Sequence, residues 1–165
     1  DSRADGRVRM GEGRGELCIG PGTVRLRAYL FKKEVVSLIE GFEHVGIGVQ
    51  DLEKAKAFYQ NVLGFEVFTE REIALGKIKK LCFMRNGNDM IELLHMPDLQ
   101  APGDGSYEVI GLAHICFKVS DFAGEVSRWA GLGVSQVVPP SPTFDGGMRT
   151  VFRGPSGEYI ELRGR

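Results

Sequence analysis

The feature that most constrains this chain of 165 residues is an internal repeat that fills its C-terminal part. Two stretches recur in order: HVGIGVQDL at 44–52 as HICFKVSDF at 114–122, and DMIEL at 89–93 as EYIEL at 158–162. His44 precedes Glu92 by 48 positions. His114 precedes Glu161 by 47 positions. Because both ends match at nearly the same spacing, the two halves are copies of one structural unit.

Each copy predicts one strand, one helix and three further strands. The first strand alternates apolar residues with small or polar ones, as a strand does when one face is buried. Asp51 and Asp121 follow these strands and predict helix N-caps, because a carboxylate accepts the free N–H groups of a first helical turn. Helices should therefore follow both, ending at Gly64 and Gly133, which suit a left-handed C-terminal residue. The remaining strands are predicted at 65–74, 78–85 and 90–95, and at 134–139, 148–153 and 158–163.

The repeat also predicts how the chain is divided. Residues 1–40 form an N-terminal extension whose first 22 residues are rich in Gly and Arg, which is typical of a flexible arm. Residues 24–40 fit either a strand or a short helix. The remaining parts are a first module at 41–96, a linker at 97–110 that is rich in Pro and Gly, and a second module at 111–165.

Four side chains are candidates for a functional site. The apolar residues of each first strand are predicted to face the helix layer, so His44 and His114 point to the opposite face. Glu92 and Glu161 lie between apolar neighbours in the last strands and point away from the helices as well. Two His and two Glu therefore converge if the two sheets curl together.

Imidazole nitrogen and carboxylate oxygen together suit a divalent Ni, Co, Mn, Fe or Zn ion, and the sequence does not choose among these metals. A cation also removes the cost, on the order of several kcal/mol, of enclosing an unpaired carboxylate. A single His or Glu in a strand is more often structural. The recurrence of both residues in both copies favours a metal site over descent from a duplicated ancestor that no longer binds metal.

Three further residues are weaker candidates. Cys116 shares the face of His114, although a small buried hydrophobic residue is the default interpretation of a free Cys. His95 is predicted to be structural, because it lies at the end of its strand with helix-facing parity. Arg149 could contact an anion, but its Gly-rich surroundings are more typical of a plain turn.

Composition excludes several classes of function. The net charge of −1 and the lack of a basic stripe argue against nucleic-acid binding. No apolar run is long enough to cross a bilayer and no signal sequence opens the chain, so we expect a cytoplasmic protein with no membrane partner. Three widely spaced cysteines predict reduced thiols.

At these motifs the sequence resembles the vicinal oxygen chelate superfamily, which includes glyoxalase I, methylmalonyl-CoA epimerase, extradiol dioxygenases and the fosfomycin and bleomycin resistance proteins. The resemblance covers residues 42–163 and rests on FEHVGIGVQDLEKAKAFYQNVLGF, the paired IEL strands and FRGPSGEYIEL. It implies an α+β fold in which two βαβββ modules form a U-shaped, barrel-like metal cleft. Modules from two chains often face each other in this superfamily, so the resemblance also implies a homodimer.

The resemblance implies a function and a small-molecule substrate as well. The set His44, Glu92, His114 and Glu161 is similar to the two-His, two-carboxylate set of glyoxalase I, with one divalent metal per site. This implies a metal-dependent lyase or isomerase of the lactoylglutathione lyase type. In the mechanism that this resemblance implies, a metal holds two oxygens of a hemithioacetal, a glutamate removes the adjacent proton, and an enediolate forms. Glu161 and Glu92 are both candidate catalytic bases, with Glu161 slightly favoured.

Two alternatives stay open. Bacterial glyoxalase I usually has an Arg where this sequence has Gly48, and the first strand is more similar to methylmalonyl-CoA epimerase, whereas the C-terminal segment is closer to glyoxalases. An epimerase of that type is therefore one alternative. The other is a non-catalytic drug-binding or resistance protein that keeps the fold and leaves the ligand positions idle.

Overall fold

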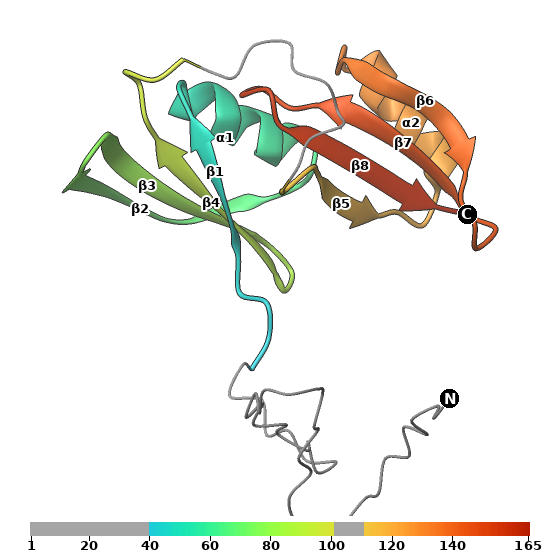
Figure 1. The fold of residues 1–165 in the computed structure, drawn as a ribbon, viewed down its shortest axis with the longest axis horizontal. Helices are drawn as coiled ribbons and strands as arrows, with labels where there is room; N and C mark the ends of the chain where they lie inside the picture. Colours follow the sequence, from blue (N-terminus) through green and yellow to red (C-terminus); the bar gives the residue numbers. More distant parts are fainter. Residues whose placement is uncertain (1–39, 101–110) are drawn as a thin grey trace, which may run out of the picture. The chain divides into compact units, whose positions relative to one another are not determined.

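Two copies of a strand–helix–three-strand unit make up the described part of the chain, residues 40–100 and 111–165 of a computed structural model (Figure 1). The predicted N-terminal extension lies outside the described residues except for Glu40. Most of the predicted linker, residues 101–110, also lies outside them.

The elements follow the same order in both modules. The first module contains β1 (Val45–Val49), α1 (Leu52–Asn61), β2 (Glu66–Leu75), β3 (Ile78–Asn86) and β4 (Asp89–His95). The second module contains β5 (Ile115–Lys118), α2 (Phe122–Gly131), β6 (Gln136–Pro142), β7 (Met148–Arg153) and β8 (Tyr159–Gly164).

Each module forms its own four-stranded sheet, with strand orders β1-β4-β3-β2 and β5-β8-β7-β6. In both sheets the first and last strands of the module pair in parallel, and the other pairs are antiparallel. The predicted βαβββ modules are therefore confirmed. The two sheets share no strand pairing among the described residues, so they do not close into a barrel.

Both helices begin at the predicted residue and end within three residues of the predicted glycine. The N–H of Lys54 donates to Asp51 Oδ1 at 3.0 Å, and the N–H of Gly124 donates to Asp121 Oδ1 at 2.9 Å. Both aspartates are thus N-caps, each of which stabilises a helix by about 1 kcal/mol. Gly64, with φ of 71°, lies in the left-handed region just after α1, where residues other than glycine are strained.

The modules contact each other on their apolar sides. The buried side chains of α1 belong to one cluster and those of α2 to another, and Phe58, Leu63 and Phe117 pack against both clusters. The fully buried Tyr59 of α1 donates its hydroxyl hydrogen to Glu158 at 2.8 Å, across the boundary between the modules. Burial and the Glu158 carboxylate raise the pKa of Tyr59 well above its ordinary value. The modules are therefore joined through buried contacts.

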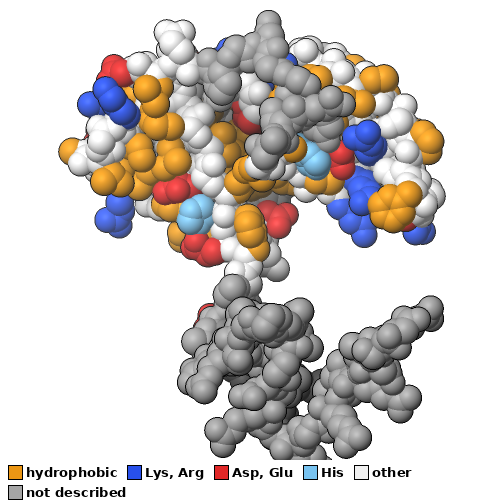
Figure 2. Space-filling model, in the orientation of Figure 1, with side chains coloured by type: hydrophobic (Ala, Val, Ile, Leu, Met, Phe, Trp, Pro, Cys, Tyr) orange, Lys and Arg blue, Asp and Glu red, His pale blue; other side chains and the backbone are white. Residues whose placement is uncertain are grey.

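The His–Glu pairs lie on the face of each sheet that is turned away from its helix. In β1, Ile47 and Val49 are buried, whereas Gly46 and Gly48, which alternate with them along the strand, are exposed. This confirms the predicted alternation. Figure 2 shows histidine side chains, in pale blue, next to acidic side chains, in red, at two places on this view of the surface. None of the helices in the described ranges is long and apolar enough to cross a membrane.

Candidate functional site

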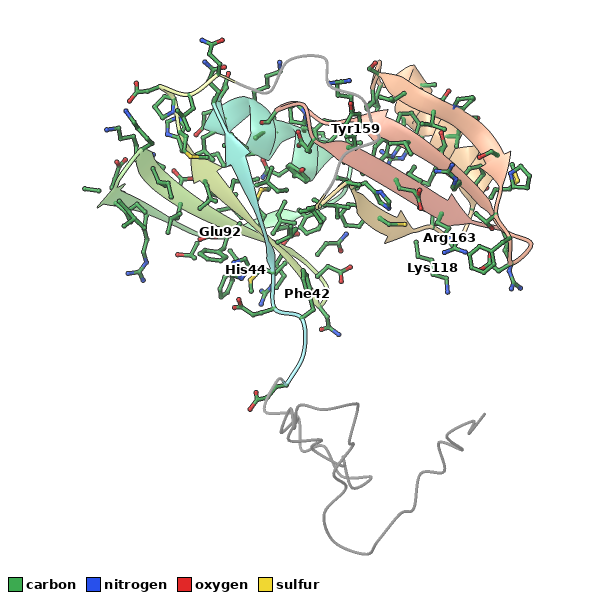
Figure 3. All side chains as sticks on the ribbon, in the orientation of Figure 1. Phe42, His44, Glu92, Lys118, Tyr159 and Arg163 are labelled. Atoms are coloured by element: carbon green, nitrogen blue, oxygen red, sulfur yellow. The ribbon has the colours of Figure 1, made fainter. Side chains whose placement is uncertain are left out.

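The first module brings His44 and Glu92 together. His44 directly precedes β1, and Glu92 lies in β4 opposite Gly46 in the parallel register. The Nε2 atom of His44 is 3.4 Å from Oε2 of Glu92, and Figure 3 shows both side chains on the same part of the sheet. A Cβ atom at position 46 would lie 3.5 Å from the same carboxylate oxygen, an ordinary van der Waals contact. Position 46 therefore lies directly beside the Glu92 carboxylate.

The surroundings of His44 orient its ring. The Glu43 carboxylate contacts Nδ1, and the ring packs edge-on against Phe83 with centroids 5.4 Å apart. A carboxylate at one ring nitrogen fixes the orientation of a histidine and makes the other nitrogen a better metal ligand. Nε2 is thus left facing Glu92.

The second module repeats the pair with different neighbours. The Nε2 atom of His114 is 4.0 Å from Oε2 of Glu161 in β8. Arg149 of β7 approaches the same oxygen, with Nη1 at 3.3 Å, so Oε2 lies between an imidazole and a guanidinium group. Glu161 is almost fully buried, with 7% of its surface exposed. Its charge is therefore balanced by cationic and hydrogen-bonding neighbours.

Cys116 also contacts Glu161. Its thiol donates to Oε1 of Glu161, with the sulfur 3.4 Å away. Desolvation of the thiol, together with the nearby Glu161 carboxylate, raises the pKa of Cys116 to about 11. As a residue Cys116 is exposed, so its default interpretation as a small buried hydrophobic residue is wrong. Cys116 stays a neutral hydrogen-bond donor beside the second pair.

The four predicted residues thus form two separate His–Glu pairs, one in each module. Among the residues of the two described ranges, no group of three or more His, Cys, Asp or Glu side chains could hold a metal ion. Two ligand atoms at about 2.1 Å from one cation lie about 3.0 Å apart at a right angle and about 3.4 Å apart at the tetrahedral angle. The His44–Glu92 separation of 3.4 Å fits this range, and the His114–Glu161 separation of 4.0 Å is slightly wider. The separation in the first pair therefore matches two ligands of one cation, and the separation in the second pair exceeds it by about 0.6 Å.

Two contacts between a predicted ligand and a neighbouring charged residue were not predicted. The contact of Arg149 with Glu161 follows from the register of β7 on β8, in which Arg149 pairs with Arg163, two residues beyond Glu161. Strand parity could have placed Arg149 on this face if the register had been known. The contact of Glu43 with His44 depends on side-chain rotamers, for which the sequence holds no signal.

Comparison with known proteins identifies the family. The model of the Glyoxalase/Bleomycin resistance protein/Dioxygenase superfamily matches residues 41–162. The chain belongs to this superfamily. A glyoxalase family protein of Enterococcus faecalis has the same fold, with a TM-score of 0.65 and 28% identity over 75% of this chain and 97% of that chain.

Relatives within the superfamily differ in their named activities. YwkD of Bacillus subtilis is 30% identical over 76% of this chain and 97% of its own length. Mitochondrial methylmalonyl-CoA epimerase of Bos taurus is 37% identical over 47% of this chain and 46% of its own length, so the chain spans about half of that epimerase. Lactoylglutathione lyase of Pseudomonas putida is 25% identical over 73% of this chain and 83% of its own length.

Members of this superfamily also bind divalent metals. A mutant of the fosfomycin resistance protein FosX of Listeria monocytogenes has been crystallised with Mn(II) and 1S,2S-dihydroxypropylphosphonic acid. Its structure superposes with a TM-score of 0.59 and 23% identity, over 76% of this chain and 90% of that chain. This likeness establishes the fold that the two proteins share.

Proposed function

We propose that this protein is a metal-dependent lyase or isomerase of the glyoxalase I type. It would move a proton between neighbouring carbons of a small substrate that has two vicinal oxygens. The observation that carries the proposal is the His44–Glu92 pair, 3.4 Å apart on the face of the sheet that lies away from the helix, and its repetition by His114 and Glu161. Imidazole and carboxylate are suitable ligands for a divalent transition metal.

A homodimer is part of the proposal. Each chain offers two half-sites, so a complete set of four ligands needs a first module to face a second module. In a dimer with two-fold symmetry, the first module of each subunit can face the second module of its partner, and two equal sites result. His44, Glu92, His114 and Glu161 are then the metal ligands, two from each subunit.

The chemistry of the chain's own residues follows from their surroundings. A bound divalent cation would supply Lewis acidity, which stabilises negative charge that develops on the substrate oxygens. The catalytic base would be Glu161 or Glu92, because a carboxylate can take the proton on carbon and return it. Glu161 is the better candidate, because Arg149 contacts its Oε2 atom and Cys116 contacts its Oε1 atom. These partners can hold Glu161 in place when it is not a metal ligand.

A specific observation supports methylmalonyl-CoA epimerase activity as a second candidate. Gly48 stands where the bacterial glyoxalase I pattern has an Arg that helps to bind glutathione, and its neighbour Met96 occupies the space that a side chain would need. An epimerase uses the same residues, since it removes a proton from one carbon and returns it to the opposite face of that carbon.

The test is activity on two substrates after metal reconstitution. The purified protein is stripped with a chelator and loaded with Ni, Co, Mn or Zn. It is then assayed with the hemithioacetal of methylglyoxal and glutathione and with methylmalonyl-CoA. Turnover of the hemithioacetal supports the lyase, and turnover of methylmalonyl-CoA alone supports the epimerase. The proposal is overturned if metal-loaded protein turns over neither substrate.

Variants connect the activity to the site. Glu161→Gln should lose activity by about 10²–10⁴-fold, the usual effect of removing a general base. Glu66→Gln is the matched control, because Glu66 is an exposed glutamate in the edge strand β2, and β3 separates it from Glu92 in β4. Equal activity of Glu161→Gln and Glu66→Gln would remove Glu161 from the mechanism.

A further inference from the structure

The two half-sites differ in charge at matching positions. Because the modules are copies, the strand registers define which residues are equivalent. The pairing of β1 with β4 corresponds to that of β5 with β8, and the pairing of β3 with β4 corresponds to that of β7 with β8. Three equivalent positions around the His–Glu pairs are uncharged in the first module and cationic in the second: Gly48 and Lys118, Leu94 and Arg163, Leu81 and Arg149.

The cationic positions of the second module lie side by side. Lys118 of β5 pairs with Arg163 of β8, and Arg163 pairs with Arg149 of β7, so the three side chains lie in a row across the sheet. Figure 3 shows Lys118 and Arg163 on the same part of the module, and Figure 2 shows Lys and Arg side chains, in blue, gathered there. An open pocket of about 740 Å³ is lined by Cys116, Lys118 and Arg163, together with Arg165. Asp145 also lines this pocket, and Arg149 does not, so the pocket holds three cationic side chains and one carboxylate. Cys116 connects the pocket to Glu161, with which it forms a hydrogen bond.

The positive charge in this pocket is only partly balanced. Arg163 pairs with Asp145, with Nη2 and Oδ2 2.6 Å apart. The Asp145 carboxylate, whose pKa is lowered to about 2 by hydrogen bonds from Thr143 and Arg163, stays ionised. Lys118 is exposed and has no ion pair with any residue of the described ranges. A pocket with excess positive charge attracts anions and binds them through charge-assisted hydrogen bonds.

The same positions in the first module form an apolar surface. A Cβ atom at Gly48 would lie 2.4 Å from the end of the Met96 side chain, which thus covers the position equivalent to Lys118. The Leu94 side chain, at the position of Arg163, lies over Gly46. Phe83 packs against His44. An anion therefore has no partner among these residues.

We infer that the substrate carries an anionic group, a carboxylate or a phosphonate, that binds Lys118 and Arg163 beside the His114–Glu161 pair. The uncharged part of the substrate lies against the apolar surface of a first module, near a His44–Glu92 pair. This inference rests on the proposed function, because it assumes that both pairs belong to one site. In a site built from two copies, the difference in charge also selects one of two otherwise similar binding orientations.

The test compares neutral and anionic ligands that share the same two metal-binding oxygens. Mn(II)-loaded protein is titrated with acetohydroxamate, with malonic monohydroxamate and with phosphonoacetohydroxamate, and dissociation constants are measured from the relaxation of water protons. At least one anionic ligand should bind wild-type protein about tenfold or more tightly than acetohydroxamate, as expected for a new charge-assisted contact. This readout does not depend on turnover.

Variants assign the preference to residues. The preference for anionic ligands is the dissociation constant of acetohydroxamate divided by that of the anionic ligand. Lys118→Gln, alone and together with Arg163→Gln, should reduce this ratio towards about one, while acetohydroxamate binds as before. Lys118 is exposed, so its substitution should not affect folding. Lys54→Gln, on the exposed side of α1, is the matched control and should keep the wild-type ratio.

The outcomes separate the two proposals. If acetohydroxamate and both anionic ligands bind the wild-type protein equally well, the inference is overturned and the proposed function stands. If the double variant keeps the preference, the assignment to Lys118 and Arg163 is wrong. If the protein binds neither Mn(II) nor acetohydroxamate, the proposed function fails and the inference fails with it.

Discussion

Mixing two inactive variants should restore metal sites if each site is formed between subunits. The perturbation is a heterodimer in which one chain carries Glu92→Gln and the other carries Glu161→Gln. Each chain has one His–Glu pair in each module, so a substitution can disrupt one pair and leave the other intact. In the heterodimer, both altered modules face each other in one site, and both wild-type modules face each other in the other site.

The expected magnitude follows from this count. The isolated heterodimer should bind about half as much tightly held metal per chain as wild type, because one of its two sites is intact. The chains are given different affinity tags and refolded together, the heterodimer is purified on both tags, and Mn(II) is measured by elemental analysis. Each parent homodimer has only altered sites, and should bind much less metal.

Two results would refute this reasoning. A heterodimer that binds no more metal than its parents would mean that the four residues do not form sites between subunits. A protein that sediments as a monomer while it holds metal would exclude the shared site altogether. Heterodimers made from wild-type and Glu66→Gln chains control for the refolding step, and should bind the full amount of metal.

Three further predictions concern the contacts around the two modules. Tyr59→Phe removes the 2.8 Å hydrogen bond to the partly buried Glu158, and urea denaturation should give a free energy of unfolding about 1–3 kcal/mol lower; an unchanged value would mean that this bond does not help to join the modules. The raised pKa of Tyr59 also predicts that stability depends on pH, because above about pH 10 Tyr59 loses its proton in the unfolded chain and keeps it in the folded chain. The free energy of unfolding should therefore fall as pH rises above about 10, and Tyr59→Phe should weaken that fall. The Cys116 thiol, with its pKa of about 11, should react with iodoacetamide at pH 8 more than about tenfold more slowly than an ordinary cysteine peptide, and mass spectrometry should find faster reaction in Glu161→Gln; equal rates would mean that Glu161 does not influence the thiol.

Local signals in the sequence predicted the elements of the fold well. The N-cap role of Asp51 and Asp121 depends on residues three positions away, and both hydrogen bonds are present. The face on which Glu92 and Glu161 lie follows from the two-residue period of a strand, which holds wherever one face is buried. Because the second module repeats the first, each interpretation made for one module also applied to the other.

Contacts between distant segments could not be predicted in this way. Whether four ligands meet within one chain depends on how the two sheets are arranged, and that arrangement is determined by buried contacts such as the one between Tyr59 and Glu158. The cationic row of the second module was present in the sequence as Lys118, Arg149 and Arg163, but its three members come from three strands. Only the strand registers reveal that they are neighbours.

The most direct test of the account is the metal content of the protein. Wild-type, Glu161→Gln and Glu66→Gln proteins are incubated with Mn(II) or Ni(II), passed through a desalting column and analysed for metal and protein concentration. The account predicts about one metal ion per chain in wild type and in Glu66→Gln, and clearly less in Glu161→Gln. Wild-type protein that retains no metal, or Glu161→Gln that retains as much as wild type, would contradict the account.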